Sequence, residues 1–384
     1  MKKLSFEKII TRLIVVILFF FLLNAGYAFA VNKTHSNDNL PNRIEYLELA
    51  NSYEKALGWK VSYINWDGGI FTWNDGNLVV YDRKWDVTPA INLISFIKSD
   101  LEKQGIDLLY VQAPNKISRL YDTDISGKLD FSNQNIDDLL TGLRGNGIEC
   151  IDIRDNIEGE GLDQHFLYYR TDNHWKAETG LWVSGIVGDY LKENYPYEID
   201  TSVLDPALYN YETLENWWIG AAGKKLTLAK TEPEDFTLIY PNFETDLTIN
   251  VPYKNVEKTG DFSVTYNNSL VFPRDFYNKY TYLAYGYGCQ PLITIKNNNA
   301  TNDTHILVLK DSFADSVYPF LALSVAQVDI IDPRYFFFDE DVDITIQEYV
   351  KNADPDIVIM LYSPLISYFP DSLNFDISRS EWEK

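Results

Sequence analysis

Short apolar runs alternate with amphipathic stretches along most of the chain. Apolar residues recur every three or four positions over 88–104, 136–143, 175–194, 313–325 and 344–352, and this spacing predicts helices. Short apolar runs predict strands at 78–81, 106–111, 148–153, 292–295, 305–309, 328–331 and 357–361. Because strands and helices alternate, we expect an α/β fold with a parallel sheet and right-handed crossovers.

The helical period disappears between residues 196 and 288. Strand-like pieces at 236–240, 247–251 and 262–266 alternate with turns there, which predicts a β-rich insertion between two halves of the α/β domain, 77–195 and 289–365. The insertion could be a substrate-facing cap or a purely structural extension. The glycine-containing stretch 220–224 lacks the spacing and the preceding strand of a phosphate loop, so we do not predict a nucleotide site.

Both ends of the chain differ from this pattern. Residues 31–76 are predicted to wrap the main domain, with one helix at 43–57, and residues 366–384 to form a surface tail. In residues 1–30, four basic side chains precede the apolar run 13–23 and the small-residue stretch 28–30. This layout fits a cleaved signal peptide or an uncleaved N-terminal anchor. Both place the domain outside the cytoplasm, either secreted or anchored to the outer face of the cytoplasmic membrane.

Composition narrows the range of partners. The formal charge of −23 argues against a nucleic-acid partner. Aromatic residues make up 15% of the chain, which suits a sugar-facing groove or ordinary packing. The two cysteines, Cys150 and Cys289, could form one disulfide or remain free thiols. No metal-ligand spacing is present, so neither a metal nor a cofactor is expected.

The stretch 168–175 holds an acid and an imidazole two residues apart, just before a predicted helix. A carboxylate that accepts a hydrogen bond from one ring nitrogen leaves the other free to take a proton, so Asp172 and His174 could be two members of a hydrolase triad. The alternative is that the pair caps the helix that follows.

A candidate nucleophile lies farther along the chain. Ser312 follows the apolar strand 305–309 and opens a predicted helix. Such junctions lie at the carboxyl ends of parallel strands, where ligands bind and where exposed amides can hold an oxyanion. The alternative is that Asp311 or Ser312 only caps the helix.

These motifs resemble those of the SGNH-hydrolase-like proteins, specifically the alginate O-acetyltransferase group and the bacterial DHHW proteins. The resemblance rests on the segments 168–175, 113–116, 306–313 and 332–336, and it covers roughly residues 70–365. It implies an SGNH-like, flavodoxin-like parallel sheet sandwiched by helices. It also implies Asp172 as the orienting acid, His174 as the general base and Ser312 as the acyl carrier.

The sequence departs from the family pattern at two positions. Asn173 stands where DHHW proteins have a second histidine. Lys310 stands where the wider superfamily has glycine, so the groups that form the oxyanion hole are not determined by the resemblance. Asn115 is a candidate oxyanion donor or a turn residue. Lys116 is a candidate substrate contact, and Arg334 could bind substrate or pair with an acid.

The resemblance implies an exported serine-dependent O-acyltransferase, most simply an O-acetyltransferase acting on a cell-envelope or secreted polysaccharide. Its partners would be an acyl donor, a polysaccharide acceptor and, by similarity to the alginate system, a membrane protein that passes acyl groups across the membrane. A carbohydrate or lipid esterase would use the same residues. A catalytically idle glycan-binding module with this fold is the third possibility.

Overall fold

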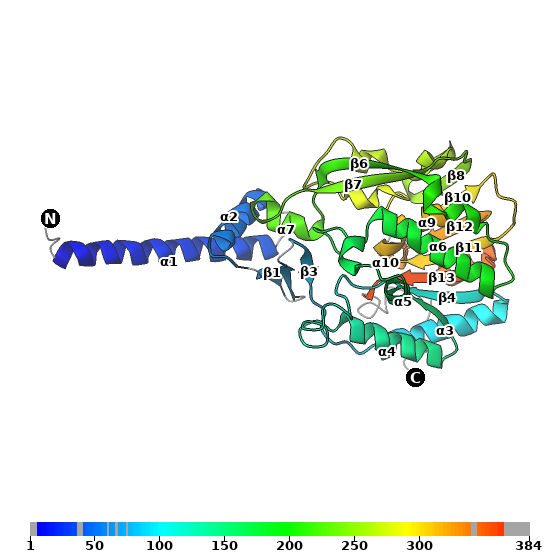
Figure 1. Cartoon of the computed structure of the whole chain (residues 1–384), viewed down its shortest axis with the longest axis horizontal. Helices are drawn as coiled ribbons and strands as arrows, with labels where there is room; N and C mark the ends of the chain where they lie inside the picture. The colour runs from blue at the N-terminus through cyan, green and yellow to red at the C-terminus, as the bar shows by residue number, and fades with distance from the viewer. Residues whose placement is uncertain are drawn as a thin grey trace.

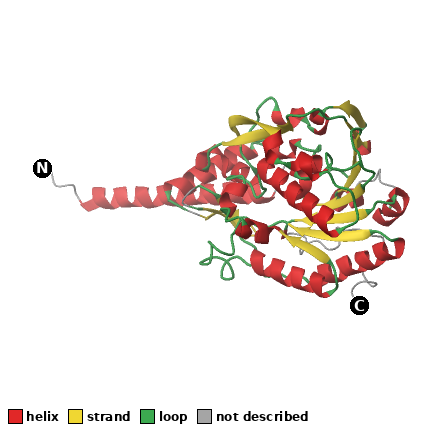
Figure 2. Ribbon diagram, turned by 45° about the vertical axis from the view of Figure 1, so that its right-hand side comes forward, coloured by secondary structure: helices red, strands yellow, loops and turns green. Residues whose placement is uncertain are grey.

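An eight-stranded sheet lies between two layers of helices, and one long helix projects from this body (Figures 1 and 2). The structure is a computed structural model, and it describes residues 6–36, 41–59, 61–65, 68–73, 76–338 and 344–364. The fold is therefore α/β, as the sequence pattern predicts. The predicted tail, 366–384, lies outside the described residues.

The elements are numbered along the chain. The helices are α1 (Phe6–Ser36), α2 (Arg43–Ala56), α3 (Thr88–Gln104), α4 (Ser132–Gly145), α5 (Ile153–Gly159), α6 (Ala177–Asn194), α7 (Ala221–Lys230), α8 (Asn268–Val271), α9 (Tyr318–Leu321), α10 (Pro333–Phe338) and α11 (Ile346–Ala353). The strands are β1 (Val61–Asn65), β2 (Gly68–Thr72), β3 (Leu78–Val80), β4 (Asp107–Gln112), β5 (Glu149–Asp152), β6 (Tyr209–Trp218), β7 (Glu234–Pro241), β8 (Leu247–Val251), β9 (Val256–Gly260), β10 (Leu292–Asn297), β11 (His305–Lys310), β12 (Gln327–Ile331) and β13 (Ile357–Tyr362).

The central sheet is mixed. Its order is β5-β4-β13-β11-β12-β10-β8-β9, and its first five strands are parallel. The predicted parallel sheet is thus confirmed in its mostly parallel part, and the remaining three strands extend it by antiparallel pairing. Because β4, β11 and β13 are parallel neighbours, the loops that follow them lie at one edge of the sheet, where ligands of α/β proteins bind.

Side-chain alternation in the central strands explains the two helical layers. In β11, Ile306 and Val308 pack on the face covered by α6, whereas Leu307 and Leu309 pack on the face covered by α3, α4 and α11. All four are at most 2% exposed, as expected for a parallel strand buried on both faces. The sheet therefore separates two cores.

The strand predicted at 78–81 does not begin the main sheet. It forms β3, which pairs with β2 in a separate three-stranded antiparallel sheet. Leu78 is buried with Ile70 and with Leu226 of α7 in a small satellite cluster. The apolar run is a strand, as predicted, but it packs against α7 and does not lie beside β4 in the main sheet.

The predicted insertion, 196–288, contains more than β structure. β8 and β9 extend the main sheet, whereas β6 and β7 form a separate two-stranded antiparallel sheet. Between β6 and β7 lies α7, a helix that the sequence pattern does not predict. Residues 262–266, predicted as a strand, begin with the 3₁₀ helix η5 (Phe262–Thr265), because the Asp261 side chain accepts from the amide of Ser263 and caps it.

The helix predicted at 313–325 is broken into two short pieces. The 3₁₀ helix η7 (Ser312–Ser316) is followed by α9, which has Pro319 in its first turn. Proline lacks the N–H that would bond back to a continuing helix, which favours a break before it. Ser312 consequently lies at the start of η7, directly after β11 and Asp311.

Candidate active site

The loop between η1 (Gln164–Leu167) and α6 brings an acid and an imidazole into contact. Asp172 Oδ1 accepts from the backbone amide of His174 at 3.0 Å and lies 2.5 Å from its Nδ1. The amide of Tyr169 donates to the His174 carbonyl at 3.1 Å and closes the loop. Asp172 is fully buried and His174 is 6% exposed. The acid is therefore shielded from water behind the ring.

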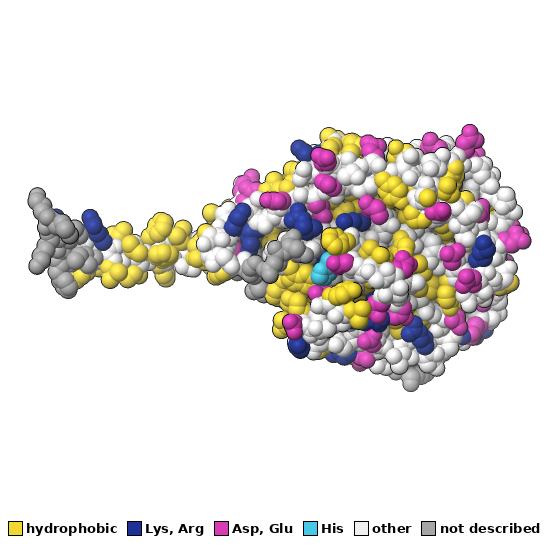
Figure 3. Space-filling view, viewed as in Figure 1, with side chains coloured by type: hydrophobic (Ala, Val, Ile, Leu, Met, Phe, Trp, Pro, Cys, Tyr) yellow, Lys and Arg dark blue, Asp and Glu magenta, His cyan; other side chains and the backbone are white. Residues whose placement is uncertain are grey.

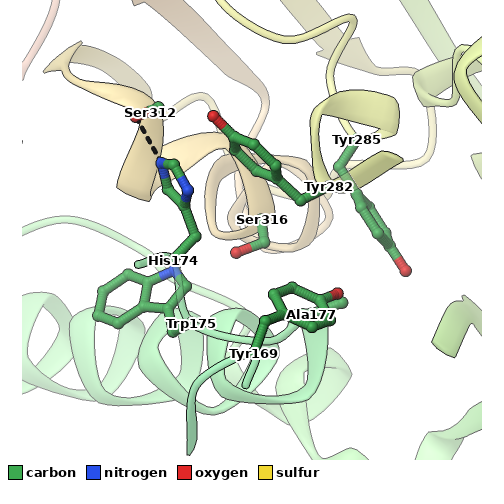
Figure 4. A pocket seen from close by; sticks show the side chains of 8 residues that line it. All are labelled: Tyr169, His174, Trp175, Ala177, Tyr282, Tyr285, Ser312 and Ser316. Carbon is green, nitrogen blue, oxygen red and sulfur yellow. Dashed lines mark hydrogen bonds between the residues drawn. The ribbon is translucent and has the colours of Figure 1, made fainter. Parts of the chain in front are cut away.

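Ser312 approaches the other side of the same ring. Its Oγ lies 2.7 Å from His174 Nε2, and the dashed line in Figure 4 marks this hydrogen bond. An ionised carboxylate can only accept, so Nδ1 holds the proton toward Asp172 and Nε2 accepts from the Ser312 hydroxyl. The structure thus places Asp172, His174 and Ser312, far apart in the sequence, in one continuous hydrogen-bonded chain.

The N-terminus of α7 supports the buried acid from behind. The amide of Ala221 donates to Asp172 Oδ2 at 2.5 Å. Burial alone would raise the pKa of Asp172, but His174 and the donating amides of Ala221 and His174 outweigh it, so the pKa lies below its ordinary value of 3.8. Asp172 consequently stays ionised and keeps the imidazole oriented.

A buried glutamate fixes α7 and the histidine loop to each other. Glu234 of β7 accepts from the amides of Arg170 at 2.6 Å and Thr171 at 2.7 Å. The Thr171 hydroxyl accepts from the amide of Gly220 at 2.7 Å. The insertion therefore contributes directly to the position of Asp172. Sequence reasoning missed this contribution, because residues 220–224 were weighed only as a phosphate loop.

Tyr282 is a second residue that the sequence did not reveal. It lies in η6 (Thr281–Ala284), and its ring stacks on His174 with centroids 3.9 Å apart. Burial raises the pKa of Tyr282 well above its ordinary value, while a side-chain hydrogen bond with Ser312 acts in the opposite direction. The phenol is therefore a neutral donor beside the serine. No local period or motif marks this position in the sequence.

His174, Ser312 and Tyr282 line a small, largely aromatic cavity of about 10 Å³, close to the size of one water molecule. Figure 4 shows its lining side chains: Tyr169, His174, Trp175, Ala177, Tyr282, Tyr285, Ser312 and Ser316. Trp175 Nε1 donates to the Phe313 carbonyl at 2.8 Å and ties the histidine loop to η7. The site accommodates a small group at Ser312 and no long chain behind it.

The other predicted site residues lie outside this cavity lining. Asn115 Oδ1 accepts from the amide of Lys116 at 2.6 Å, a contact typical of a turn residue. Lys116 is 2% exposed, and its ammonium donates to the carbonyls of Leu78, Tyr169, Arg170 and Asp172. This position favours a structural role, in which Lys116 holds the backbone around Asp172, over contact with a substrate.

Arg334 and Lys310 both take part in ion pairs. Arg334 donates to the two oxygens of Asp332 at 2.9 and 2.6 Å, which favours the structural pair over substrate binding. Lys310 is fully buried, 2.5 Å from Asp315 and 3.5 Å from Asp332. Cys289 lies against the same cluster, and it and Cys150 are free thiols. Within the described residues, no group of three metal-binding side chains comes together.

Comparison with known proteins agrees with this geometry. Residues 71–202 match the family described as "SGNH hydrolase-like domain, acetyltransferase AlgX", a region that includes Asp172 and His174 and ends before Ser312. About a third of the chain is therefore similar to an SGNH hydrolase-like domain of the AlgX type. No curated protein sequence matches the chain.

Two solved structures share the fold. Bacillus cereus PatB1 with a sulfonyl adduct is 19% identical with a TM-score of 0.64, and the match covers 78% of this chain and 95% of that one. A DHHW family protein from Eubacterium siraeum is 16% identical with a TM-score of 0.58, covering 80% and 94%. The SGNH-like fold and the resemblance to DHHW proteins are thus confirmed.

Proposed function

We propose that this chain is an exported serine-dependent O-acyltransferase that moves an acetyl group from an acyl donor to a hydroxyl of a cell-envelope or secreted polysaccharide. The observation that carries the proposal is the hydrogen-bonded chain from Asp172 through His174 to Ser312. The match of residues 71–202 to an acetyltransferase family supports the choice of acyl group.

In the first half-reaction, Ser312 Oγ attacks the carbonyl carbon of the donor while its proton passes to His174 Nε2. The imidazolium is stabilised by the ionised Asp172 and returns the proton to the leaving group. This leaves an acyl ester on Ser312. The Tyr282 hydroxyl and the backbone amide of Ser312 are candidates to hold the oxyanion that forms on the way.

In the second half-reaction, His174 takes the proton of a sugar hydroxyl, whose oxygen attacks the ester carbon. As the ester bond to Ser312 breaks, His174 returns the proton to Ser312 Oγ, which restores the free serine. Water in place of the sugar would give hydrolysis with the same residues. The small cavity beside Ser312 leaves no room for a long acyl chain, which argues against a lipid esterase.

The test uses the purified chain with 4-nitrophenyl acetate and a fluorophosphonate probe. We expect turnover and labelling at Ser312, and loss of both in Ser312→Ala and His174→Ala. Ser202→Ala is the matched control, because Ser202 is exposed, lies in the 3₁₀ helix Thr201–Leu204 outside the cavity lining, and should leave turnover unchanged. If the wild type neither turns over nor labels at Ser312, the chain is a binding module and the proposal fails.

The acceptor is tested by adding candidate glycans to the reacting enzyme. Acetylated glycan found by mass spectrometry, at the expense of free acetate, supports transfer. Free acetate as the sole product with every glycan would show a carbohydrate esterase instead.

A further inference from the structure

The N-terminal helix α1 has two parts with different surroundings. From Ile10 to Leu23 every large apolar side chain is at least 37% exposed. This stretch extends away from the body, and Figure 3 shows it as a nearly continuous apolar rod. A surface of this kind has no counterpart in water-exposed helices, which keep one polar face.

The apolar rod and the docked residues that continue it are together long enough to cross a bilayer. The candidate span Ile10–Val31 has 22 residues and a mean hydropathy of 2.5. At 1.5 Å per residue it measures about 33 Å, against roughly 30 Å for the hydrocarbon core. Basic residues lie at its N-terminal end, which favours a cytoplasmic N-terminus and an external domain.

The second part of α1 is docked onto α2. Tyr27 donates to Glu54 Oε1 at 2.7 Å, and Tyr53 donates to Asn24 Oδ1 at 3.0 Å. Ala30 is only 1% exposed. These are specific side-chain contacts between the apolar leader and the rest of the chain, which a segment destined for removal would not need.

The same docking buries Ala30, the last residue of the stretch that resembles a cleavage site, and leaves Phe29 55% exposed. The small-residue stretch 28–30 lies inside α1, which continues without a break to Ser36. Proteolysis occurs in exposed, locally unfolded backbone, whereas Ala30 is buried in a helix. In the folded chain, Ala30 is therefore inaccessible to a protease.

Aromatic side chains gather where α1 meets α2. The Tyr27 ring lies 5.2 Å from Tyr53 and 5.7 Å from Trp59, and Phe29 lies 6.3 Å from Tyr46. We call these five residues the aromatic collar. Tyr and Trp are enriched at the headgroup level of membranes because they are apolar at one end and polar at the other.

Exposed apolar side chains lie on and beside α2 next to the collar. Leu49 is 60% exposed, Leu57 is 47% exposed and Trp59 of the collar itself is 45% exposed. Such side chains at the base of a membrane-length helix are suited to the lipid headgroup region. They extend the apolar surface of α1 onto the folded body.

We infer that α1 is retained as a transmembrane anchor and that the aromatic collar lies in the headgroup layer of a phospholipid bilayer. This inference does not depend on the acyl-transfer proposal. It extends beyond a tether, because α2 is joined to α7: Asn51 donates to the Lys225 carbonyl at 2.9 Å, and Lys230 pairs with Glu54 at 3.1 Å.

Because the amide of Ala221 at the start of α7 donates to Asp172, a continuous set of packed elements runs from the anchor to the candidate active site. The site is consequently held at a fixed distance and orientation from the membrane surface. Its substrates would then be groups presented close to that surface.

The first test is the intact mass of the full chain, with a C-terminal tag, recovered from bacterial membranes after alkaline carbonate washing. We expect a chain that still contains residues 1–30 and stays in the membrane pellet. A soluble chain that begins at Val31 would overturn the inference. Ser312→Ala serves as a control: its retention should be unchanged, which separates this test from any failure of the proposed activity.

The second test measures lipid contact at the collar. In a full chain with Cys150 and Cys289 replaced by alanine, a fluorophore on Leu49→Cys is compared with one on Glu257→Cys, at the far sheet edge. Chains are reconstituted in phosphatidylglycerol and phosphatidylethanolamine vesicles that contain brominated lipid. We expect at least a twofold greater loss of fluorescence at residue 49. An equal loss of fluorescence at both positions would show that the collar does not touch lipid, even if α1 is retained.

Discussion

The sharpest test of the site changes none of the three residues that form it. Gly220 precedes α7 and lies against the acid: a Cβ added there would stand 2.3 Å from Asp172 Cβ and 2.5 Å from Asp172 Oδ2. Ordinary contacts begin near 3.4 Å, so Gly220→Ala must move Asp172 or the start of α7 by about 1 Å. The backbone carbonyl of Thr171, 2.6 Å from the same point, blocks the nearest escape.

The size of the effect follows from what that shift breaks. The contact of Asp172 with His174 Nδ1 is 2.5 Å, and a 1 Å displacement removes it. Misplacement of this order costs about 10²-fold in rate, and loss of the orienting acid costs about 10⁴-fold. We therefore expect kcat/KM of Gly220→Ala to fall by about 10² to 10⁴, or roughly 3 to 5 kcal/mol of transition-state stabilisation.

The assay is turnover of 4-nitrophenyl acetate with the unfolding midpoint measured alongside. Gly185→Ala is the matched control, since a Cβ there has its nearest neighbour, the Leu204 carbonyl, at 4.0 Å. It should keep full activity and gain slightly in stability, as alanine is favoured over glycine within a helix. A folded Gly220→Ala enzyme within threefold of wild-type activity would refute the assignment of Asp172.

Three further outcomes are expected. Tyr282→Phe keeps the ring on His174 and removes the hydroxyl, so kcat should fall about 10²-fold, as for loss of one oxyanion donor; a loss below twofold would exclude that role. Because burial raises the pKa of Cys150 to about 12 and that of Cys289 well above its ordinary value, neither thiol should react with iodoacetamide at pH 8 unless guanidinium is present; rapid alkylation of the native chain, seen by mass, would contradict this. Because the pKa of Asp172 is lowered on folding, its ionisation stabilises the fold above about pH 4 and this stability is lost as pH falls through the lowered value; the difference in urea midpoint between wild type and Asp172→Asn should shrink on acidification, and a constant difference would refute it.

The sequence predicted the parts of the site that are encoded locally. Asp172 and His174 are two residues apart, and Ser312 follows a strand whose apolar run is unmistakable, so both could be found without coordinates. The contact between His174 and Ser312 depends on the position of β11 inside the sheet. The alternation of strands and helices in the sequence predicts a central strand of this kind. Local spacing and strand order were sufficient for these three residues.

Tyr282 and Gly220 could not be predicted in the same way. Each acts through a contact with a residue more than 45 positions away, and each lies in a segment without helical or strand period. The short helices there are set by single caps, such as Asp261 on η5, and by tertiary packing, which outweighs weak local preference. For the same reason, β8 joins the main sheet although its sequence only indicates an isolated strand, and β9, which was not predicted, pairs with it.

Lys310 resolves the main departure from the family pattern. A glycine at position 310 would matter if the backbone there needed a positive φ, but Lys310 is the last residue of β11 and does not have a positive φ, so its conformation is open to any residue. Burial would lower the pKa of Lys310, yet Asp315 and the other charged neighbours outweigh it and the pKa is raised, so the ammonium stays charged beneath the turn. Since Asp315 belongs to η7, the ion pair fixes the helix that begins with Ser312. The lysine therefore stabilises the position of Ser312, the proposed nucleophile, through the helix that Ser312 begins.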